Sequence, residues 1–486
     1  MAPLGTAQNP VRAAIVGSGP SGFYAAEALF DSDQVVLVDM FERLPSPFGL
    51  VRSGVAPDHP KLKQPIQLYQ KIAESPNFRF LGNVTVGRDL SVEELQRCYH
   101  VLIFACGAEA DRRLGIPGEH LAGSHTATEF VGWYNGHPDY RDREFDLSHE
   151  TAVVIGQGNV AVDVCRILCK TMDELVHTDI ASHAIEVLAQ SRIRDVYMIG
   201  RRGPAQAKFT HQELRELGQL KDCDPIVARG ELELNPPSRE ELLDKNNRAG
   251  GKSYEVLQSF AARSAPTRSR RCHIRFLRSP LALEGEGRLE RVLLARNRLE
   301  GTPSQQVARE TGEVERLECG LLFRSIGYRG TAISGVPFDA RQGIFPNRDG
   351  RIVDGQGNAL PGMYATGWIK RGPTGLIGTN RADSLATVAA LQADLPHLST
   401  TVKAGADGLL PLLQSRGVRV VSYADWQKID AAEVRRGESA GKPREKFTRV
   451  HEMMQAIEPP TPPRRLAVEL AGTALAMVSN LAENPR

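Results

Sequence analysis

Cysteine is scarce in this sequence and never occurs in a paired motif. The 486 residues contain seven cysteines, no Cys-x-x-Cys pair and no cluster-binding array. An odd, scattered set argues against a disulfide framework and favours a reducing compartment. It also leaves no redox cysteine pair for a flavin-linked dithiol reductase, and we expect no metal site. Cys165 and Cys169, four residues apart on an expected helix, are interpreted as small apolar side chains packed on a sheet.

Long apolar runs and a strong net charge are missing too. No stretch reaches the roughly 18 apolar residues of a membrane span, so we expect no membrane span. The net charge of +2 gives no reason to expect nucleic acid. The length favours two or three domains. The first ten residues have no secretory core and no Arg-rich presequence. With the Arg- and Ala-rich composition, this favours a bacterial cytoplasm, or a mitochondrial matrix if a presequence has been removed.

A glycine-rich turn follows the first apolar run, residues 11–16. It contains Gly17, Gly19 and Gly22, with Pro20 and Ser21 between them. Such a turn lets backbone N–H groups approach a pyrophosphate at a helix N-terminus. The next apolar strand, residues 35–38, precedes Glu42, which stands 20 residues after Gly22. An acid at this offset accepts hydrogen bonds from a ribose hydroxyl, so this site suits FAD.

A second turn of this kind differs in its downstream partner. It reads Gly156-Gln157-Gly158-Asn159-Val160 and is matched by an expected strand over residues 195–199. Arg201 and Arg202 then occupy the region where an acid would otherwise stand. Guanidinium groups bind a 2′-phosphate through charge-assisted, fork-like hydrogen bonds, so this site suits NADPH. The alternative is a Rossmann turn without a ligand and a solvated arginine pair.

The two turns predict an α/β protein with two Rossmann-like dinucleotide-binding domains. We expect the FAD domain to comprise residues 1–108 and 331–457, interrupted by an NADP domain at 109–330. Residues 458–486 form a Pro-rich linker and tail, with a short apolar-faced helix within 466–481. Residues 234–272 are polar, and we interpret them as a surface excursion. The Pro- and Gly-rich loop over residues 44–60 is long enough to suggest a functional role.

Several motifs together resemble the adrenodoxin-reductase type of ferredoxin–NADP⁺ reductase. The resemblance runs from about residue 11 to Lys446. It rests on the two glycine turns and on the following motifs: Pro47-Phe-Gly-Leu-Val-Arg52, Val55-Ala-Pro-Asp-His-Pro60, Gly200-Arg-Arg-Gly203 and Gly367-Trp-Ile-Lys-Arg-Gly-Pro-Thr-Gly375. It implies a glutathione-reductase-like arrangement in which the NADP domain is inserted into a discontinuous FAD domain.

The resemblance also implies roles for particular residues. FAD contacts fall on Ser21, Glu42, Leu50, Val86, Trp368, Gly375, Leu376 and Ile377. NADPH contacts fall on Gln157, Gly158, Asn159, Val160, Arg201, Arg202, Glu213 and Gly375. Glycine at position 375 leaves room for nicotinamide to stack on the flavin. His59 and Asp163 match a pair near the flavin, and His59 has either a proton-transfer role or a purely structural one.

The implied function is transfer of electrons from NADPH through FAD, one at a time, to an adrenodoxin-like [2Fe–2S] ferredoxin. That ferredoxin would dock transiently on a monomer and supply a system such as a cytochrome P450. Arg239, Arg268, Arg270 and Arg271 are candidate docking residues, or else a solvated segment with no partner. Alternative functions are an NADPH-dependent diaphorase with another acceptor, the flavin subunit of a larger complex, and a non-catalytic FAD-bound sensor.

Overall fold

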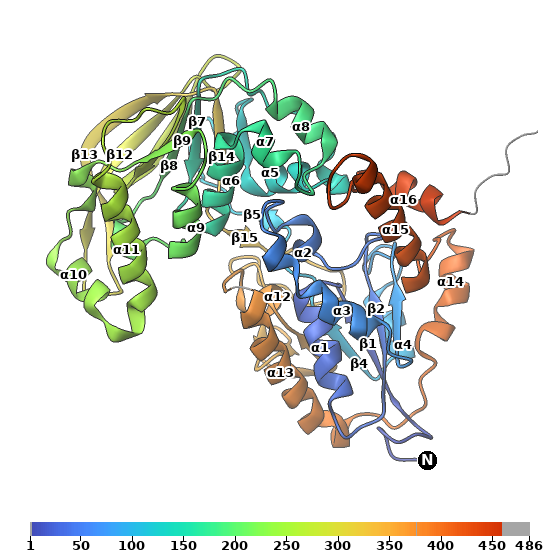
Figure 1. Ribbon diagram of the computed structural model, residues 1–486. Helices are drawn as coiled ribbons and strands as arrows, with labels where there is room; N and C mark the ends of the chain where they lie inside the picture. The colour runs from blue at the N-terminus through green and yellow to red at the C-terminus, as the bar shows by residue number, and fades with distance from the viewer. Residues whose placement is uncertain (1, 376, 459–486) are drawn as a thin grey trace, which may run out of the picture.

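The computed structural model describes residues 2–375 and 377–458, which form two lobes (Figure 1). We call them the first unit, built around a seven-stranded sheet, and the second unit, built around a six-stranded sheet. The chain starts in the first unit, passes through the second and returns to the first. A short antiparallel pair marks this crossing and is made by β5 (Ala110–Asp111) and β15 (Tyr328–Arg329). The fold is therefore the expected discontinuous arrangement.

The seven-stranded sheet has the strand order β16-β17-β18-β4-β1-β2-β3. Its strands are β1 (Val11–Val16), β2 (Val36–Phe41), β3 (Phe78–Leu81), β4 (Val101–Phe104), β16 (Asn347–Arg348), β17 (Arg351–Val353) and β18 (Ala359–Ala365). β1 lies between β2 and β4 in parallel register. Strands flanked by parallel neighbours in this way are buried on both faces, which explains their nearly continuous apolar sequences.

Helices cover the seven-stranded sheet, and some of them reach towards the second unit. They are α1 (Pro20–Phe30), α2 (Leu50–Ser53), α3 (Ile66–Ala73), α4 (Val92–Cys98), α12 (Trp368–Arg371), α13 (Ile377–Asp394), α14 (Leu410–Ser415), α15 (Tyr423–Ser439) and α16 (Val450–Ile457). α1 and α13 run side by side, and α2 lies at the junction of the two lobes (Figure 1). α4 and α15 each begin with a capping box, at Ser91 and Ser422, which satisfies N–H groups at their first turns.

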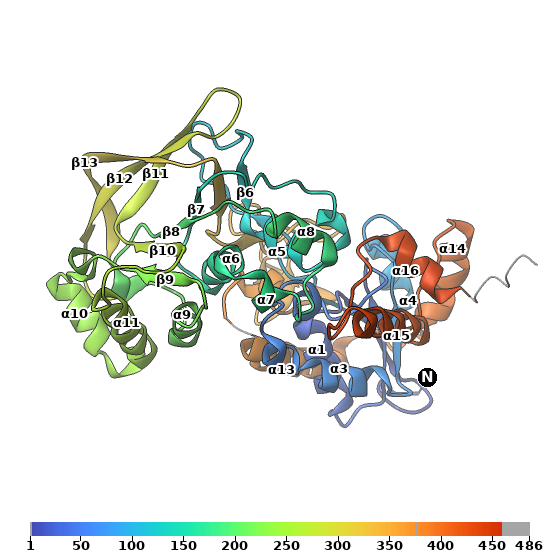
Figure 2. The same cartoon turned by 45° about the horizontal axis from the view of Figure 1, so that its top comes forward.

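The six-stranded sheet is parallel, with the order β6-β14-β7-β8-β10-β9. Its strands are β6 (Ser124–Thr126), β7 (Thr151–Ile155), β8 (Asp195–Ile199), β9 (Cys223–Ile226), β10 (Arg270–Arg275) and β14 (Leu321–Arg324). The second unit's helices are α5 (Ala127–Tyr134), α6 (Asn159–Cys169), α7 (Met172–Leu175), α8 (Ser182–Leu188), α9 (His211–Leu217), α10 (Pro236–Leu243) and α11 (Arg248–Ala261). A second, antiparallel sheet consists of β11 (Arg278–Glu284), β12 (Arg291–Glu300) and β13 (Val307–Glu318), seen at the upper left of Figure 2.

The expectation of a surface excursion at residues 234–272 is wrong. This segment contains α10, α11 and the start of β10, an inner strand of the six-stranded sheet. Val256, Leu257 and Phe260 on α11 pack into the core of the second unit. The apolar face of α11 is diluted by intervening polar residues, which explains why composition alone gave a surface assignment.

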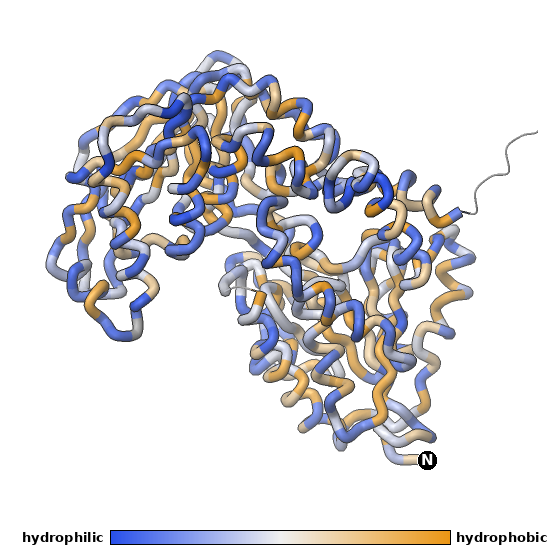
Figure 3. Tube along the Cα trace, in the orientation of Figure 1, coloured by the Kyte–Doolittle hydropathy of each residue, from blue (hydrophilic) through white to orange (hydrophobic). Residues whose placement is uncertain are grey.

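Buried apolar residues form the core of each lobe, and Figure 3 colours the hydrophobic segments of the trace orange. Cys165 and Cys169 are fully buried on α6, as interpreted from their spacing, and all seven cysteines are free. Across residues 2–375 and 377–458, no helix combines the length and apolar character that crossing a bilayer requires. The expected tail helix within 466–481 lies outside the described residues, and the domain limits at residues 108, 330 and 457 stay predictions.

Candidate functional site

The first glycine turn connects β1 to α1 at the carboxyl edge of the seven-stranded sheet. Gly17 has φ +106°, and a Cβ there would lie 2.5 Å from the carbonyl oxygen of Ala105 on the adjacent strand connection. At Gly22 a Cβ would lie 2.2 Å from Gly17 O. A Cβ at Gly19, which caps α1 just before Pro20, would instead have no other atom within 4 Å. The turn is thus closed on its protein side and open on the side where a ligand would approach.

Glu42 lies directly after β2 and beside this turn. Its Oε2 accepts hydrogen bonds from Ser18 N at 3.2 Å and from Ser18 Oγ at 2.6 Å. Its Oε1 accepts one from Leu44 N at 3.1 Å. The carboxylate is therefore held at the tip of the sheet by the glycine turn itself. This is the position required of an acid that accepts hydrogen bonds from a ribose.

The loop that follows Glu42 returns to the glycine turn through a close backbone contact. Gly49 has φ +48°, and a Cβ there would lie 2.9 Å from Gly19 Cα. Leu50 opens α2 with a side chain that remains 43% exposed, unusual for a large apolar residue next to a core. Val86, by contrast, is buried in the loop between β3 and α4, within an apolar cluster of the first unit.

The chain returns to this region at the end of β18. Gly367 has φ +74°, and a Cβ there would lie 2.1 Å from Ser21 Oγ. α12 therefore begins in contact with the first glycine turn. Trp368, the first residue of α12, stacks on Tyr328 with ring centroids 5.3 Å apart. Its indole Nε1–H is buried and has no hydrogen-bond partner among the described residues. A buried indole donor normally has an acceptor, and a bound ligand would provide one.

These features fit a flavin dinucleotide held by the first unit. The open face of Gly19, the exposed Leu50 and the unpartnered Trp368 Nε1 all border the same turn region. Gly375 is exposed with φ +85°, where an L side chain is strained, and a Cβ there would also meet the Thr379 side chain at 2.8 Å. Ile377 begins α13, whereas Leu376 lies outside the described residues.

The second glycine turn repeats the geometry between β7 and α6. Gly156 has φ +138°, and a Cβ there would lie 2.0 Å from Ser325 O. A Cβ at Gly158 would have no other atom within 4 Å. Gln157 O accepts hydrogen bonds from Lys208 N at 2.8 Å and from Phe209 N at 3.1 Å. Asn159 Oδ1 accepts one from Thr210 N at 2.8 Å, and Val160 is half-buried on α6. The backbone carbonyl of Gln157 and the side chain of Asn159 therefore fix the loop that leads into α9.

Arg201 and Arg202 follow β8 at the same edge of the six-stranded sheet. Arg201 is exposed and Arg202 is half-buried. Among the described residues, no carboxylate lies within 4 Å of either guanidinium, although most arginines of this chain are paired. Burial and the charge of Arg201 lower the pKa of Arg202. Two unpaired guanidinium groups beside a dinucleotide turn suit a phosphate dianion.

A buried charged cluster joins the loop after α2 to α6 and α9. It brings together His59, Asp58, Asp163, Arg166, Lys170, Glu213 and Glu216. His59 Nε2 lies 2.5 Å from Glu216 Oε2 and 3.7 Å from Glu213 Oε2. Asp163 Oδ1 accepts a hydrogen bond from Arg166 at 2.9 Å. His59 and Asp163 are thus members of one cluster, but the direct partners of His59 are the two glutamates of α9.

Carboxylates outnumber the fixed cations in this cluster, four to two. Burial, then the charge of Glu213, holds the pKa of Asp163 well above its ordinary value. Burial also raises the pKa of Glu213. Burial acts in the same direction on Asp58, but Arg166 and Lys170 outweigh it and lower that pKa. Burial and the neighbouring carboxylates therefore favour the protonated form of Asp163 more than that of Asp58.

His59, Glu213 and Glu216 also have the spacing of a metal site, because one ligand atom from each lies within 4.8 Å of the others. The Arg166 guanidinium lies 3.2 Å from Glu213 and 3.5 Å from Glu216, so the two carboxylates already have a cation. The sequence analysis missed Arg166 and Glu216. Their spacing from Asp163 and Glu213, three residues along a helix in each case, was a visible signal.

The candidate docking arginines lie elsewhere. Arg271 and Asp195 form an ion pair at the amino ends of β10 and β8, opposite the edge that carries Arg201. Arg270 donates hydrogen bonds to the carbonyl oxygens of Cys169 and Lys170, and Arg268 donates to those of Leu220 and Cys223. Arg268, Arg270 and Arg271 therefore hold neighbouring chain segments in place, and a docking role for them stays a prediction.

Comparison with known proteins gives consistent relatives. Residues 11–198 match the model of the pyridine nucleotide-disulphide oxidoreductase family. An NADPH-ferredoxin reductase FprA of Mycobacterium leprae is 46% identical over 91% of this chain and 97% of its own. An NADPH:adrenodoxin oxidoreductase of Arabidopsis thaliana mitochondria is 42% identical over 92% and 95%.

A solved structure extends this agreement to three dimensions. FprA of Mycobacterium tuberculosis in complex with NADPH superposes with a TM-score of 0.87 at 44% identity, covering 92% of this chain and 99% of its own. The chain therefore belongs to the family of NADPH:adrenodoxin oxidoreductases and NADPH-ferredoxin reductases.

Proposed function

We propose that this protein is an FAD-containing enzyme that takes electrons from NADPH and passes them singly to a ferredoxin. The observation that carries the proposal is a pair of dinucleotide turns with opposite chemistry. Glu42 is held beside one turn. The guanidinium groups of Arg201 and Arg202, which have no carboxylate partner among the described residues, stand beside the other. The family relatives, which are named as reductases of ferredoxin and adrenodoxin, support the same function.

The protein's own part in the chemistry is binding, orientation and proton control. FAD, when bound, accepts two electrons together and releases them one at a time. Gly17, Gly19, Pro20, Ser21, Gly22, Glu42, Leu50, Val86, Trp368, Leu376 and Ile377 would hold it. Gln157, Gly158, Asn159, Val160, Arg201, Arg202 and Glu213 would hold NADPH, and Gly375 would border both. We further propose that the FAD domain comprises residues 1–108 and 331–457, and the NADP domain residues 109–330.

The buried cluster supplies a route for protons. His59 Nε2 and Glu216 Oε2 share a hydrogen bond, and the Glu216 side chain is 45% exposed, whereas that of His59 is 8% exposed. A proton can therefore pass between the interior of the cluster and solvent without a large movement. Burial raises the pKa of Asp163, which would let this carboxyl hold a proton for the same network.

The finer features of the proposal concern the partner and the location. We propose a small acidic [2Fe–2S] ferredoxin that docks transiently on a monomer. The Arg- and Ala-rich composition supports a bacterial cytoplasm. Arg239, exposed on α10, is the docking candidate that we favour.

The test is reduction of the FAD-loaded protein under anaerobic conditions, followed by electron transfer. NADPH should bleach the flavin rapidly and NADH slowly. Cytochrome c reduction should then be slow without ferredoxin and much faster with it. Failure of NADPH to bleach the flavin would overturn the enzyme assignment. Rapid bleaching without any stimulation by a panel of ferredoxins would instead support a diaphorase with another acceptor.

A further inference from the structure

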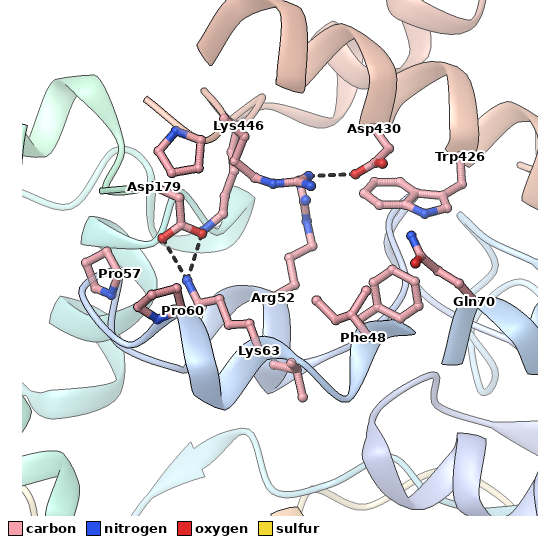
Figure 4. A pocket seen from close by; sticks show the side chains of 14 residues that line it. Phe48, Arg52, Pro57, Pro60, Lys63, Gln70, Asp179, Trp426, Asp430 and Lys446 are labelled. Atoms are coloured by element: carbon pink, nitrogen blue, oxygen red, sulfur yellow. Dashed lines mark hydrogen bonds and ion pairs between the residues drawn. The ribbon is translucent and has the colours of Figure 1, made fainter. Parts of the chain in front are cut away.

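A cavity of about 180 Å³ lies behind α2, between the first unit, the second unit and the chain segment after α15. Its apolar wall consists of Phe48, Val51, Ile66 and Trp426, together with Pro57, Pro60 and Pro443 (Figure 4). Pro60 and Pro443 are exposed, so this wall reaches the surface. No residue that we assign to FAD or NADPH is among the residues that line the cavity. It is therefore separate from the cofactor site.

Charged side chains line the rest of the cavity, and nearly all are paired. The Arg52 guanidinium donates to both carboxylate oxygens of Glu433, at 2.8 and 2.5 Å, and lies over the Trp426 ring at 4.9 Å. Arg444 donates to Asp430 at 2.6 Å and to Glu433 at 3.2 Å. On this side of the cavity, each arginine therefore has a carboxylate partner.

On the opposite side of the cavity, cations outnumber carboxylates by one. Lys63 Nζ donates to both oxygens of Asp179, each at 2.7 Å, as the dashed lines in Figure 4 show. Lys446 Nζ lies 3.1 Å from Asp179 Oδ2, an oxygen that already accepts a hydrogen bond from Lys63, and it has no other partner among the described residues. Lys446 is only 2% exposed. Across residues 2–375 and 377–458, the four cations Arg52, Lys63, Arg444 and Lys446 pair with only the three carboxylates Asp179, Asp430 and Glu433.

We propose that this cavity binds a small monoanion that joins a carboxylate to a compact apolar group. The carboxylate would accept a hydrogen bond from Lys446 and neutralise the surplus charge, and the apolar group would lie against Phe48, Ile66 and Trp426. A buried ammonium that shares its one carboxylate with a second lysine is costly, so an anion that provides another acceptor and a negative charge binds favourably. A polyanion does not suit a surplus of one charge, and a neutral molecule leaves that charge uncompensated.

Binding of this ligand is coupled to a proton. Burial, together with the neighbouring cations Lys63 and Arg52, outweighs Asp179 and lowers the pKa of Lys446 to about 7. The groups that face Lys446 are Asp179 from the loop before α8, Lys63 from the turn before α3, Arg52 from α2 and Arg444 from its own segment. An anion beside Lys446 favours its charged form. Binding above neutral pH must therefore take up a proton, whereas binding below it need not.

Benzoate is a suitable probe, with benzamide as its neutral counterpart. Both are titrated calorimetrically into the FAD-loaded full-length protein, and proton uptake is followed separately in a pH-stat. Benzoate should bind and benzamide should not. Uptake should approach about one proton per benzoate near pH 8 and fall well below that near pH 6. Equal binding of the two probes, or benzoate binding without proton uptake near pH 8, would overturn the proposal.

Three variants locate the site. Lys446→Met should weaken benzoate binding by about tenfold or more and abolish the proton uptake. Ile66→Trp, which fills the cavity from α3 and leaves every charge in place, should also remove binding and covers the case in which Lys446→Met fails to fold. Lys442→Met is the matched control, because Lys442 is buried nearby but bonds to Ile180 O and Glu445 outside the cavity. Unchanged affinity in Ile66→Trp, or equal losses in Lys442→Met and Lys446→Met, would refute the site.

Discussion

At the scale of single residues, we expect coenzyme choice to depend on two arginines that have no carboxylate partner among the described residues. Replacing Arg201 and Arg202 with alanine should lower the ratio of kcat/KM for NADPH over NADH. Charge-assisted hydrogen bonds contribute about 1.5–3 kcal/mol each with incomplete additivity, so the loss should be about 2–4 kcal/mol, or roughly 30- to 900-fold. Steady-state kinetics with both coenzymes measures it. Arg194→Ala, an exposed arginine before the amino end of β8, is the control, and an unchanged ratio in the double variant would place the 2′-phosphate elsewhere.

Glu42 should matter for the other dinucleotide. Glu42→Ala removes the carboxylate that Ser18 and Leu44 hold at the turn, and with it an acceptor for a ribose hydroxyl. Loss of one such bond to a charged group costs about 1.5–3 kcal/mol, so FAD should bind roughly 10- to 150-fold more weakly. The flavin released on dilution or dialysis measures this, with the NADPH-to-NADH ratio of the reloaded enzyme unchanged. Full flavin retention together with altered coenzyme choice would show that the two sites are exchanged.

At the scale of elements, the β1–α1 turn tolerates no side chain at Gly17. Gly17→Ala forces a Cβ to within 2.5 Å of Ala105 O at φ +106°, and the contact is with backbone that cannot rotate away. Strain of this kind costs on the order of 1–3 kcal/mol or more. The midpoint of urea unfolding should fall accordingly. In Gly355→Ala, where a Cβ meets nothing within 4 Å, the midpoint should hardly change, and equal midpoints in the two variants would contradict the argument.

Local patterns predicted what depends on local geometry. Both glycine turns, their flanking strands and the offset to Glu42 could be read because steric and hydrogen-bonding needs lie within about thirty residues. β10 was missed although the buried Cys272 and Ile274 alternate with Arg271, His273 and Arg275, since these polar residues dominated the composition. The contact of His59 with Glu216 spans 157 positions and crosses from one unit to the other. No periodicity in a single sequence reports such a contact.

At the scale of the whole molecule, Asp179 of the second unit is held by two lysines of the first. Lys63 lies before α3 and Lys446 after α15, so this ion cluster connects three parts of the chain. Asp179 stays charged because Lys446 and Lys63 together lower its pKa to about 2 against the effect of burial. Lys446 is the member whose pKa falls to about 7, because its side chain is buried and the cations Lys63 and Arg52 lie nearby.

Stability should therefore depend on pH through Lys446. Its pKa falls from 10.5 to about 7 on folding, so between these values the unfolded chain binds one more proton than the folded one. The contribution of this group to the free energy of unfolding then rises with pH, by up to about 1.4 kcal/mol per pH unit. Below about pH 7 both states carry the charge, and the cost of burying it is full and constant. Lys446→Met has no such group, so the stability of the wild type relative to this variant should increase from about pH 7 to pH 9 and be flat below.

Urea unfolding of both FAD-loaded proteins across this range measures the difference, and Lys442→Met controls for the loss of a buried lysine. Parallel curves for wild type and Lys446→Met would show that Lys446 keeps its proton in the folded protein.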